Sequence, residues 1–382
     1  MVTHRIYCDY AASTPIAQDV TIAMREFHET HGPGNASSLH HDGRAIRAAM
    51  DVAHDRVARL LQCDFKDVLF TSGGTESDNL AIIGSLLSRR DSGRNRIVVG
   101  ASEHHAVTDA AKFAGQFLGA DIQFVRVDSA ARVDLDHLQS LVDDNTAVVS
   151  IQHANNEVGS IQPVLEVAAI AHACGAWFHC DAVQTPVTVP FKVDDLGADL
   201  VTISSHKIYG PGGVGALHSR VPIQPLHVGG AQERGLRAGS ENVVGAVGFG
   251  AAAELESARQ QSGSGEIKAV AALVHHLRTL LDMHPNVIVN TPSNRAIPTL
   301  LHLSIPGCST EDILMLLDRR GISASGGAAC ASGAVEPSHV VKACGWSPMQ
   351  QEGALRLSFG LGTTIDDIDY VAAAVGLIAS RG

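Results

Sequence analysis

Lysine, aromatic side chains and long hydrophobic runs are all scarce in this chain of 382 residues. Its longest uncharged apolar stretch, residues 242–253, is shorter than the roughly 20 residues that a membrane-spanning helix needs. Arg5 and Asp9 interrupt the region where a signal peptide requires an apolar run, so we expect a cytoplasmic protein without membrane contact. A net charge of −12 lacks the basic footprint of nucleic acid binders, so we expect no direct nucleic acid partner.

The seven cysteines lack the pattern of a disulfide framework or a zinc site. Their number is odd and no two have CxxC spacing, which indicates a reduced protein; the histidines show no HExxH pattern, and we expect no metal. Six cysteines lie in or beside apolar segments, as core thiols do. Cys330 instead lies among the small residues of 325–333, where a thiol can be exposed and reactive. A thiol in a tight turn is an equally good interpretation of that pattern alone.

Short apolar runs alternate with helical patterns through the first 260 residues or so. This alternation predicts an α/β fold whose mostly parallel sheet is covered on both faces. Ligands of such sheets bind beyond the carboxyl ends of the strands. We expect strands at 68–71, 96–99, 122–127, 147–152, 177–180, 200–204 and 214–218, and helices including 75–88 and 164–174.

A polar stretch rich in glycine and serine, residues 259–265, marks the expected domain boundary. An amphipathic helical pattern follows it, with apolar residues from Ile267 to Leu281 on one face. We therefore predict a large domain over residues 15–262. A smaller α+β domain, made of residues 1–14 and 263–382, would carry Cys330.

Lys207 lies four positions beyond the end of the apolar run 200–203 and precedes the turn-rich residues 209–213. A lysine at the end of a buried strand lies at the ligand-binding edge of the sheet. Lysine amines form Schiff bases with carbonyl compounds such as pyridoxal phosphate. On spacing alone, a surface lysine at the start of a loop is the more common situation.

Two further segments have the same placement. Asp181 ends the apolar run 177–180, where a carboxylate can pair with the ring nitrogen of pyridoxal phosphate, or can simply cap a helix. Residues 72–75, Ser-Gly-Gly-Thr, join a strand to a helix, so their N–H groups could bind a phosphate, or again only cap the helix. Residues 210–215 match GxGxxG, but no helix follows, which excludes a dinucleotide site.

Taken together, these motifs resemble the pyridoxal-phosphate-dependent cysteine desulfurases, members of the class V aminotransferase-like group with the aspartate-aminotransferase fold (fold type I). The resemblance runs from Tyr7 to Asp369. It implies a large domain with a mostly parallel sheet, a smaller α+β domain and a homodimer. The motifs that carry it are residues 7–15, 34–40, 71–79, 155–159, 181–184, 204–210, 233–240, 330–339 and 356–360.

The resemblance also implies a role for each matching residue. Lys207 would hold pyridoxal 5'-phosphate through a Schiff base, Asp181 would pair with the ring nitrogen, and His104 would stack on the ring and move protons. The other predicted contacts are Gln184 and Asn155 to the ring oxygen; Gly74, Thr75, Ser204 and His206 to the phosphate, with Ser240 reaching it from the neighbouring subunit; and Arg356, Asn35 and Asn155 to the substrate carboxylate.

The activity implied is the conversion of L-cysteine to L-alanine. Cys330 would keep the sulfur as a persulfide and pass it to an acceptor protein, in iron–sulfur assembly or nucleic-acid thiolation. A selenocysteine lyase would share nearly all these residues, whereas another pyridoxal-phosphate β-lyase would not need Cys330. A sulfur-relay subunit without catalysis is disfavoured because Lys207, Asp181 and His104 are all present.

Overall fold

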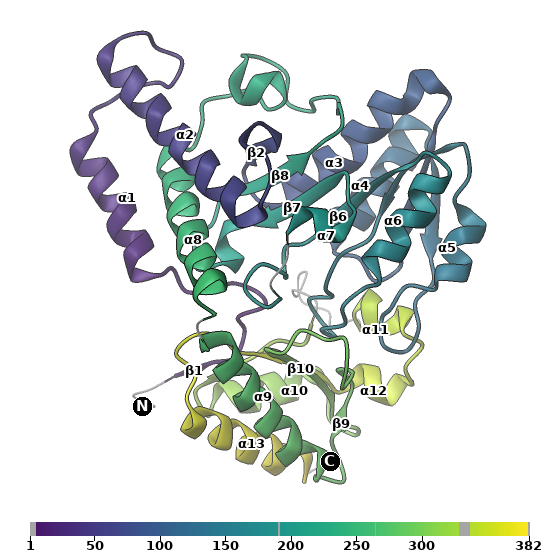
Figure 1. The fold of residues 1–382 in the computed structure, drawn as a ribbon. Helices are drawn as coiled ribbons and strands as arrows, with labels where there is room; N and C mark the ends of the chain where they lie inside the picture. Colours follow the sequence, from purple (N-terminus) through teal and green to yellow (C-terminus); the bar gives the residue numbers. More distant parts are fainter. Residues whose placement is uncertain (1–4, 190–191, 264, 328–336, 381–382) are drawn as a thin grey trace.

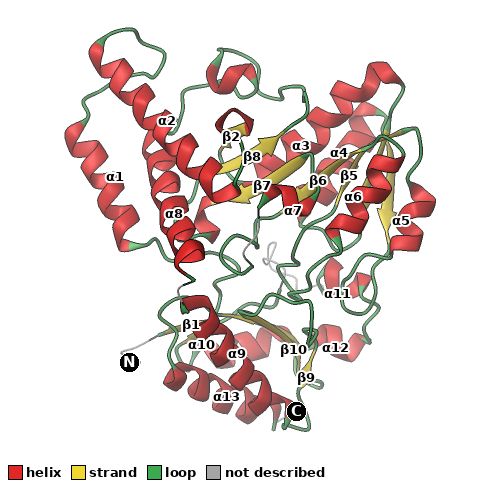
Figure 2. Ribbon diagram, viewed as in Figure 1, coloured by secondary structure: helices red, strands yellow, loops and turns green. Residues whose placement is uncertain are grey.

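The computed structural model describes residues 5–189, 192–263, 265–327 and 337–380. They form a large α/β part with a smaller part beside it (Figures 1 and 2). Among these residues, no helix is both long enough and apolar enough to cross a bilayer.

The large part is built on a seven-stranded sheet with the order β2-β8-β7-β6-β5-β3-β4. The strand β8 runs opposite to the other six, which all share one direction, so the sheet is mostly parallel, as predicted. The strands are β2 (Val68–Thr71), β3 (Arg96–Gly100), β4 (Asp121–Val125), β5 (Thr146–Ser150), β6 (Trp177–Asp181), β7 (Leu200–Ser204) and β8 (Gly215–Ser219).

Helices cover both faces of this sheet because successive strand residues point to opposite sides. In β7, Val201 and Ile203 join the core beneath α2 (His41–Leu61), α6 (Val164–Ala173) and α8 (Val243–Ser262). Leu200 faces the other side, which α3 (Gly74–Arg89) covers together with α4 (His105–Leu118). The remaining helices of this part are α1 (Gln18–Thr30), α5 (Leu135–Leu141) and α7 (Val193–Leu196).

The smaller part has its own core around an antiparallel sheet, β12-β10-β9. The first strand of the chain also belongs here, because β1 (Ile6–Tyr7) pairs with β11 (Ile322–Ser323). The other elements are α9 (Glu266–Asp282), β9 (Ile288–Val289), β10 (Leu300–Ser304), α10 (Thr310–Asp318), α11 (His339–Ala343), α12 (Pro348–Glu352), β12 (Ala354–Ser358) and α13 (Ile365–Ala379).

The predicted strands all occur, with small differences at their ends. Those at 68–71 and 200–204 have the predicted bounds, and the other five differ by one or two residues at one or both ends. The helix after residue 74 begins one residue earlier than predicted, because Gly74 already takes part in its first turn.

Candidate active site

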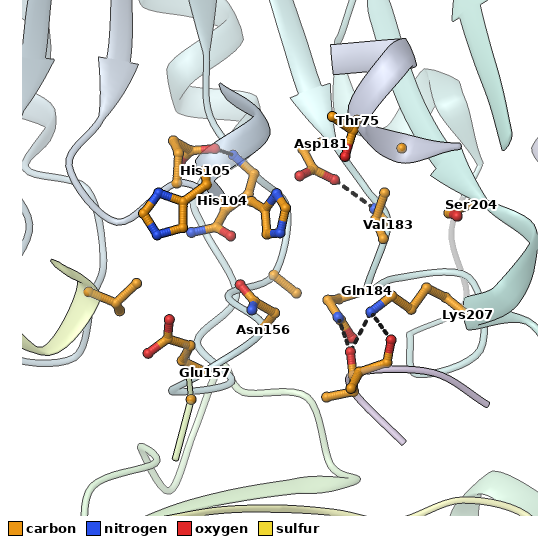
Figure 3. A pocket seen from close by; sticks show the side chains of 18 of the residues that line it. Thr75, His104, His105, Asn156, Glu157, Asp181, Val183, Gln184, Ser204 and Lys207 are labelled. Carbon is orange, nitrogen blue, oxygen red and sulfur yellow. Dashed lines mark hydrogen bonds between the residues drawn. The ribbon is translucent and has the colours of Figure 1, made fainter. Parts of the chain in front are cut away.

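A cavity of about 400 Å³ lies where β6 and β7 end and α3 and α4 begin (Figure 3). It is therefore at the carboxyl ends of parallel strands, where α/β sheets bind their ligands. Nine of the predicted site residues line it: Gly74, Thr75, His104, Asp181, Gln184, Ser204, His206, Lys207 and Arg356.

Asp181 is the last residue of β6, and the buried strand places its carboxyl group at the inner wall of the cavity. One carboxyl oxygen accepts a hydrogen bond from the Val183 N–H at 2.9 Å. Burial raises the pKa of Asp181, and the nearby His104 and Lys207 oppose that rise. A positively charged partner in the cavity would therefore stabilise the carboxylate, because a buried charge needs an opposite one.

Lys207 ends the short 3₁₀ turn that follows β7, and its amine enters the cavity from the side opposite His104 (Figure 3). The ammonium donates to the carbonyl oxygens of Ala11 and Ala12, the latter at 2.9 Å. Burial lowers the pKa of Lys207 to about 8, with a further contribution from the positive charge of Arg356. A neutral amine is thus accessible near physiological pH, as a nucleophilic lysine requires.

His104 precedes α4 and caps it, because its Nδ1 accepts the Ala106 N–H at 3.1 Å. An accepting Nδ1 places the proton of the neutral ring on Nε2. Burial lowers the pKa of His104, so the neutral form is favoured. The ring therefore presents a flat apolar surface and one N–H at the cavity.

The end of the cavity at the N-terminus of α3 suits an anion. The first turn of the 16-residue α3 points there, and helix N-termini attract phosphate. Gly73 has φ 152° and ψ −179°, a conformation essentially reserved for glycine. Thr75 and Ser204 add hydroxyl groups, and His206 lies beside them with a pKa that burial and Lys207 lower to about 4.

Arg356 reaches the cavity from β12 in the smaller part and is almost completely buried. Its guanidinium donates to an Asp9 carboxyl oxygen at 2.7 Å and to the Asn156 carbonyl oxygen at 2.9 Å. A substrate carboxylate would therefore compete with the Asp9 carboxylate for the N–H groups of the Arg356 guanidinium. Gln184 also lines the cavity, and its amide donates to the Ala11 carbonyl oxygen at 2.9 Å.

The structure does not bring Asn155 into the cavity, contrary to the prediction. Its side-chain oxygen accepts the N–H groups of Glu157 at 2.9 Å and Val158 at 2.7 Å, and its amide donates to Ser102 at 3.1 Å. The side chain is committed to its own turn and is fully buried. The next residue, Asn156, lines the cavity instead.

Two other predicted residues, Asn35 and Ser240, do not line the cavity of this chain. Asn35 is exposed and bonds to the Ser37 N–H at 2.8 Å. Ser240 is exposed on the loop between the 3₁₀ turn at Gln232–Gly235 and α8. Cys330 lies outside the described residues.

Several residues that line the cavity were not predicted as site residues, among them Glu103, Glu157 and His339. Glu103 precedes His104 and is buried, and Glu157 is buried within the 155–159 motif. His339 follows residues 328–336, the segment that carries Cys330 (the Cys330 segment), and its Nε2 is 2.7 Å from the Glu103 carbonyl oxygen. Glu157 and His339 lie within the motifs at 155–159 and 330–339, and Glu103 precedes His104, so only their place in or beside these motifs could have indicated them.

The six cysteines that the structure describes form no disulfide. Burial raises the pKa of Cys8, Cys63 and Cys344 to about 12, and raises that of Cys180 as well. Thiols of this kind are poor nucleophiles at neutral pH. Three of the six, Cys8, Cys180 and Cys344, are buried as core thiols, whereas Cys63, Cys174 and Cys308 are only half-buried at the edges of the cores.

Solved structures with the same architecture define the class of protein. A NifS-like protein matches with a TM-score of 0.90 at 33% identity, over 99% of this chain and 100% of that one. A structure of SspA in complex with cysteine matches with a TM-score of 0.81 at 27% identity, over 94% and 100%. The chain has the class V aminotransferase fold, which confirms the predicted fold class.

The sequence comparison gives the family. The model of the Aminotransferase class-V family matches residues 6–371, so the chain belongs to that family. Cysteine desulfurase IscS of Dictyoglomus turgidum is 40% identical over 368 residues, 96% of this chain and 92% of that protein. The putative cysteine desulfurase IscS 1 of Bacillus subtilis is 38% identical over 381 residues, 99% of each. The resemblance to cysteine desulfurases is thereby confirmed.

Proposed function

We propose that this protein is a pyridoxal-phosphate-dependent cysteine desulfurase that forms L-alanine from L-cysteine and keeps the sulfur on Cys330. The observation that carries the proposal is that Lys207, Asp181 and His104 line one cavity, which Arg356 reaches from the smaller part. The names of the relatives point to the same activity.

The residues present fit pyridoxal phosphate. The amine of Lys207 could bind its aldehyde, Asp181 its protonated ring nitrogen, and Thr75, Ser204 and His206 its phosphate at the start of α3. When bound, this cofactor withdraws electrons from the substrate and so stabilises negative charge on its carbon atoms. The raised pKa of Asp181 agrees with a group that awaits a cationic partner.

The protein's own residues would then position the substrate and move its protons. Arg356 suits the substrate carboxylate because its guanidinium can form two parallel bonds, one of which Asp9 now occupies. Lys207, with a pKa of about 8, can accept a proton at Nζ and return it. His104 would press on the cofactor ring and offer the proton on its Nε2.

In the sulfur-transfer step, Cys330 would act as the nucleophile. Its thiolate would attack the sulfur of bound L-cysteine, so that a sulfur–sulfur bond forms and the carbon–sulfur bond breaks. The electron pair of the broken bond stays on the substrate carbon, which takes up a proton on the way to L-alanine. The persulfide would then pass its outer sulfur to an acceptor protein, in iron–sulfur assembly or nucleic-acid thiolation.

We also propose that the chain works as a homodimer. Ser240 is exposed and lies outside the cavity of its own chain, which suits a residue that reaches the phosphate in a partner's cavity. The loop that carries it is tied to the same α3 that begins at the phosphate end, because Arg237 donates to Glu76 at 3.0 Å.

Peptide mass spectrometry after brief L-cysteine treatment without reductant tests the activity. We expect one added sulfur atom on Cys330 and release of L-alanine, with both lost in Lys207→Ala. In Cys330→Ala, the sulfur gain should vanish while the cofactor absorbance still responds to L-cysteine. L-Alanine release that survives Cys330→Ala at full rate would indicate a different β-lyase. Competition between cysteine and selenocysteine would identify a selenocysteine lyase.

A further inference from the structure

Glu157 is a buried carboxylate at the cavity wall that has no part in the chemistry described above. It lies in the loop between β5 and α6, and its side chain is 3% exposed. Burying a carboxylate is costly unless its oxygens are used. The contacts of the two carboxyl oxygens therefore indicate the role of Glu157.

The first oxygen holds the residues that follow the Cys330 segment. The Ser338 hydroxyl donates to Oε1 of Glu157 at 2.9 Å, and Ser338 also caps α11 by accepting the Val340 N–H. The adjacent His339 bonds to the Glu103 carbonyl oxygen at 2.7 Å. Two neighbouring side chains thus fix this end of the segment to the large part of the molecule, next to the cavity.

The second oxygen faces the residues that precede the segment. Oε2 is buried and has no hydrogen-bond partner among the described residues. Gly327, with φ 105°, lies directly against it, since a Cβ atom added there would be 2.6 Å from Oε2. Two residues earlier, Ser325 exchanges backbone hydrogen bonds with Arg356, at 2.6 Å and 3.3 Å.

We propose, on the basis of the desulfurase function above, that Glu157 is a positioning residue for residues 328–336, the segment that carries Cys330: its Oε1 binds Ser338 after the segment, and its Oε2 packs against Gly327 before it. Gly327 and Ser338 are eleven positions apart in the sequence, yet Gly327 packs against this carboxyl group and Ser338 donates a hydrogen bond to it. Fixing the two ends of a short segment raises the effective concentration of any group on it near the anchor. The group concerned is the thiol that receives the sulfur.

Glu157→Ala and Glu157→Gln test this in the holoenzyme. In Glu157→Ala we expect sulfur transfer to Cys330, followed in a single turnover, to slow by about tenfold or more, because the Ser338 hydroxyl loses a buried charged acceptor. Glu157→Gln keeps an acceptor oxygen, so its rate should stay within about threefold of the wild type. Gly327→Ala should also slow the transfer, because its methyl group would collide with Oε2.

Two further measurements separate positioning from general damage. Exchange of the Cα proton of L-alanine in D₂O would use Lys207 without Cys330, so Glu157→Ala should leave it unchanged. Amide hydrogen exchange over residues 338–343 should become faster in the same variant. Glu256→Gln, which alters a buried glutamate in α8 outside the cavity, is the matched control and should change none of these.

Each contrary result is distinct. Sulfur transfer at the wild-type rate in Glu157→Ala would overturn the inference, and so would an equal loss of alanine proton exchange, which would mean a role in the whole cavity. If the wild-type protein places no sulfur on Cys330, the proposed function itself is wrong and the inference falls with it.

Discussion

Loading of pyridoxal phosphate should report the acidity of Lys207 directly. Burial and Arg356 lower the pKa of Lys207 from 10.5 to about 8. That difference corresponds to about 3 kcal/mol in favour of the neutral amine. At pH 7, about a tenth of the amine is then neutral, against about 0.03% for an ordinary lysine. Aldehyde capture by the apoprotein should therefore rise about tenfold per pH unit below pH 8 and level off above it.

Stopped-flow absorbance after mixing apoprotein with pyridoxal phosphate between pH 6 and pH 10 would measure this profile. Arg356→Gln supplies the control, because removing a neighbouring positive charge should move the midpoint to higher pH. A rate that climbs steadily to pH 10 in the wild type would mean an ordinary lysine and refute the reasoning from burial. An unchanged midpoint in Arg356→Gln would refute the contribution of that charge.

Three other substitutions have defined outcomes. Gly73→Ala forces a side chain into a conformation costing about 1–3 kcal/mol, so spectral titration should show weaker cofactor binding. His54→Ala removes the hydrogen-bond partner whose Nε2 lies 3.0 Å from a buried Glu233 carboxyl oxygen; thermal unfolding should show a loss of about 1–3 kcal/mol, smaller in His54→Gln. Asp181→Asn should slow alanine release by about a hundredfold or more, since it leaves a buried ring cation unpaired; a smaller loss would contradict that pairing.

The strand ends explain why much of the site was predictable. Asp181 and Lys207 each follow a continuous apolar run, and such runs are buried strands in parallel sheets. Because parallel strands end at one edge, two residues 26 positions apart had to meet there. The helix that follows β2 was predictable to within one residue at its start, since a strand, a glycine turn and a helix can be recognised from local sequence alone.

Contacts between the two parts of the molecule were beyond such reasoning. Which of Asn155 and Asn156 lines the cavity depends on which side chain forms the hydrogen bonds of the turn. A turn has no regular side-chain periodicity from which the sequence could predict this. Pairing of Asp9 with Arg356 joins residues 347 positions apart. The contact of His339 with the Glu103 carbonyl joins residues 236 positions apart. No local pattern encodes either contact.

The pairing of β1 with β11 has a consequence for the order of events on the ribosome. The segment after β1 supplies the Ala11 and Ala12 carbonyls that hold Lys207, and it is itself fixed by a bond from the Ala11 N–H to the Ser358 hydroxyl at 2.9 Å. These first residues emerge early, but their partners near residues 322 and 358 are made last. Domains generally fold as units during synthesis. The large sheet can therefore form before the contacts that hold the Lys207 amine are complete, because those contacts need the first residues of the chain to dock on the last ones made.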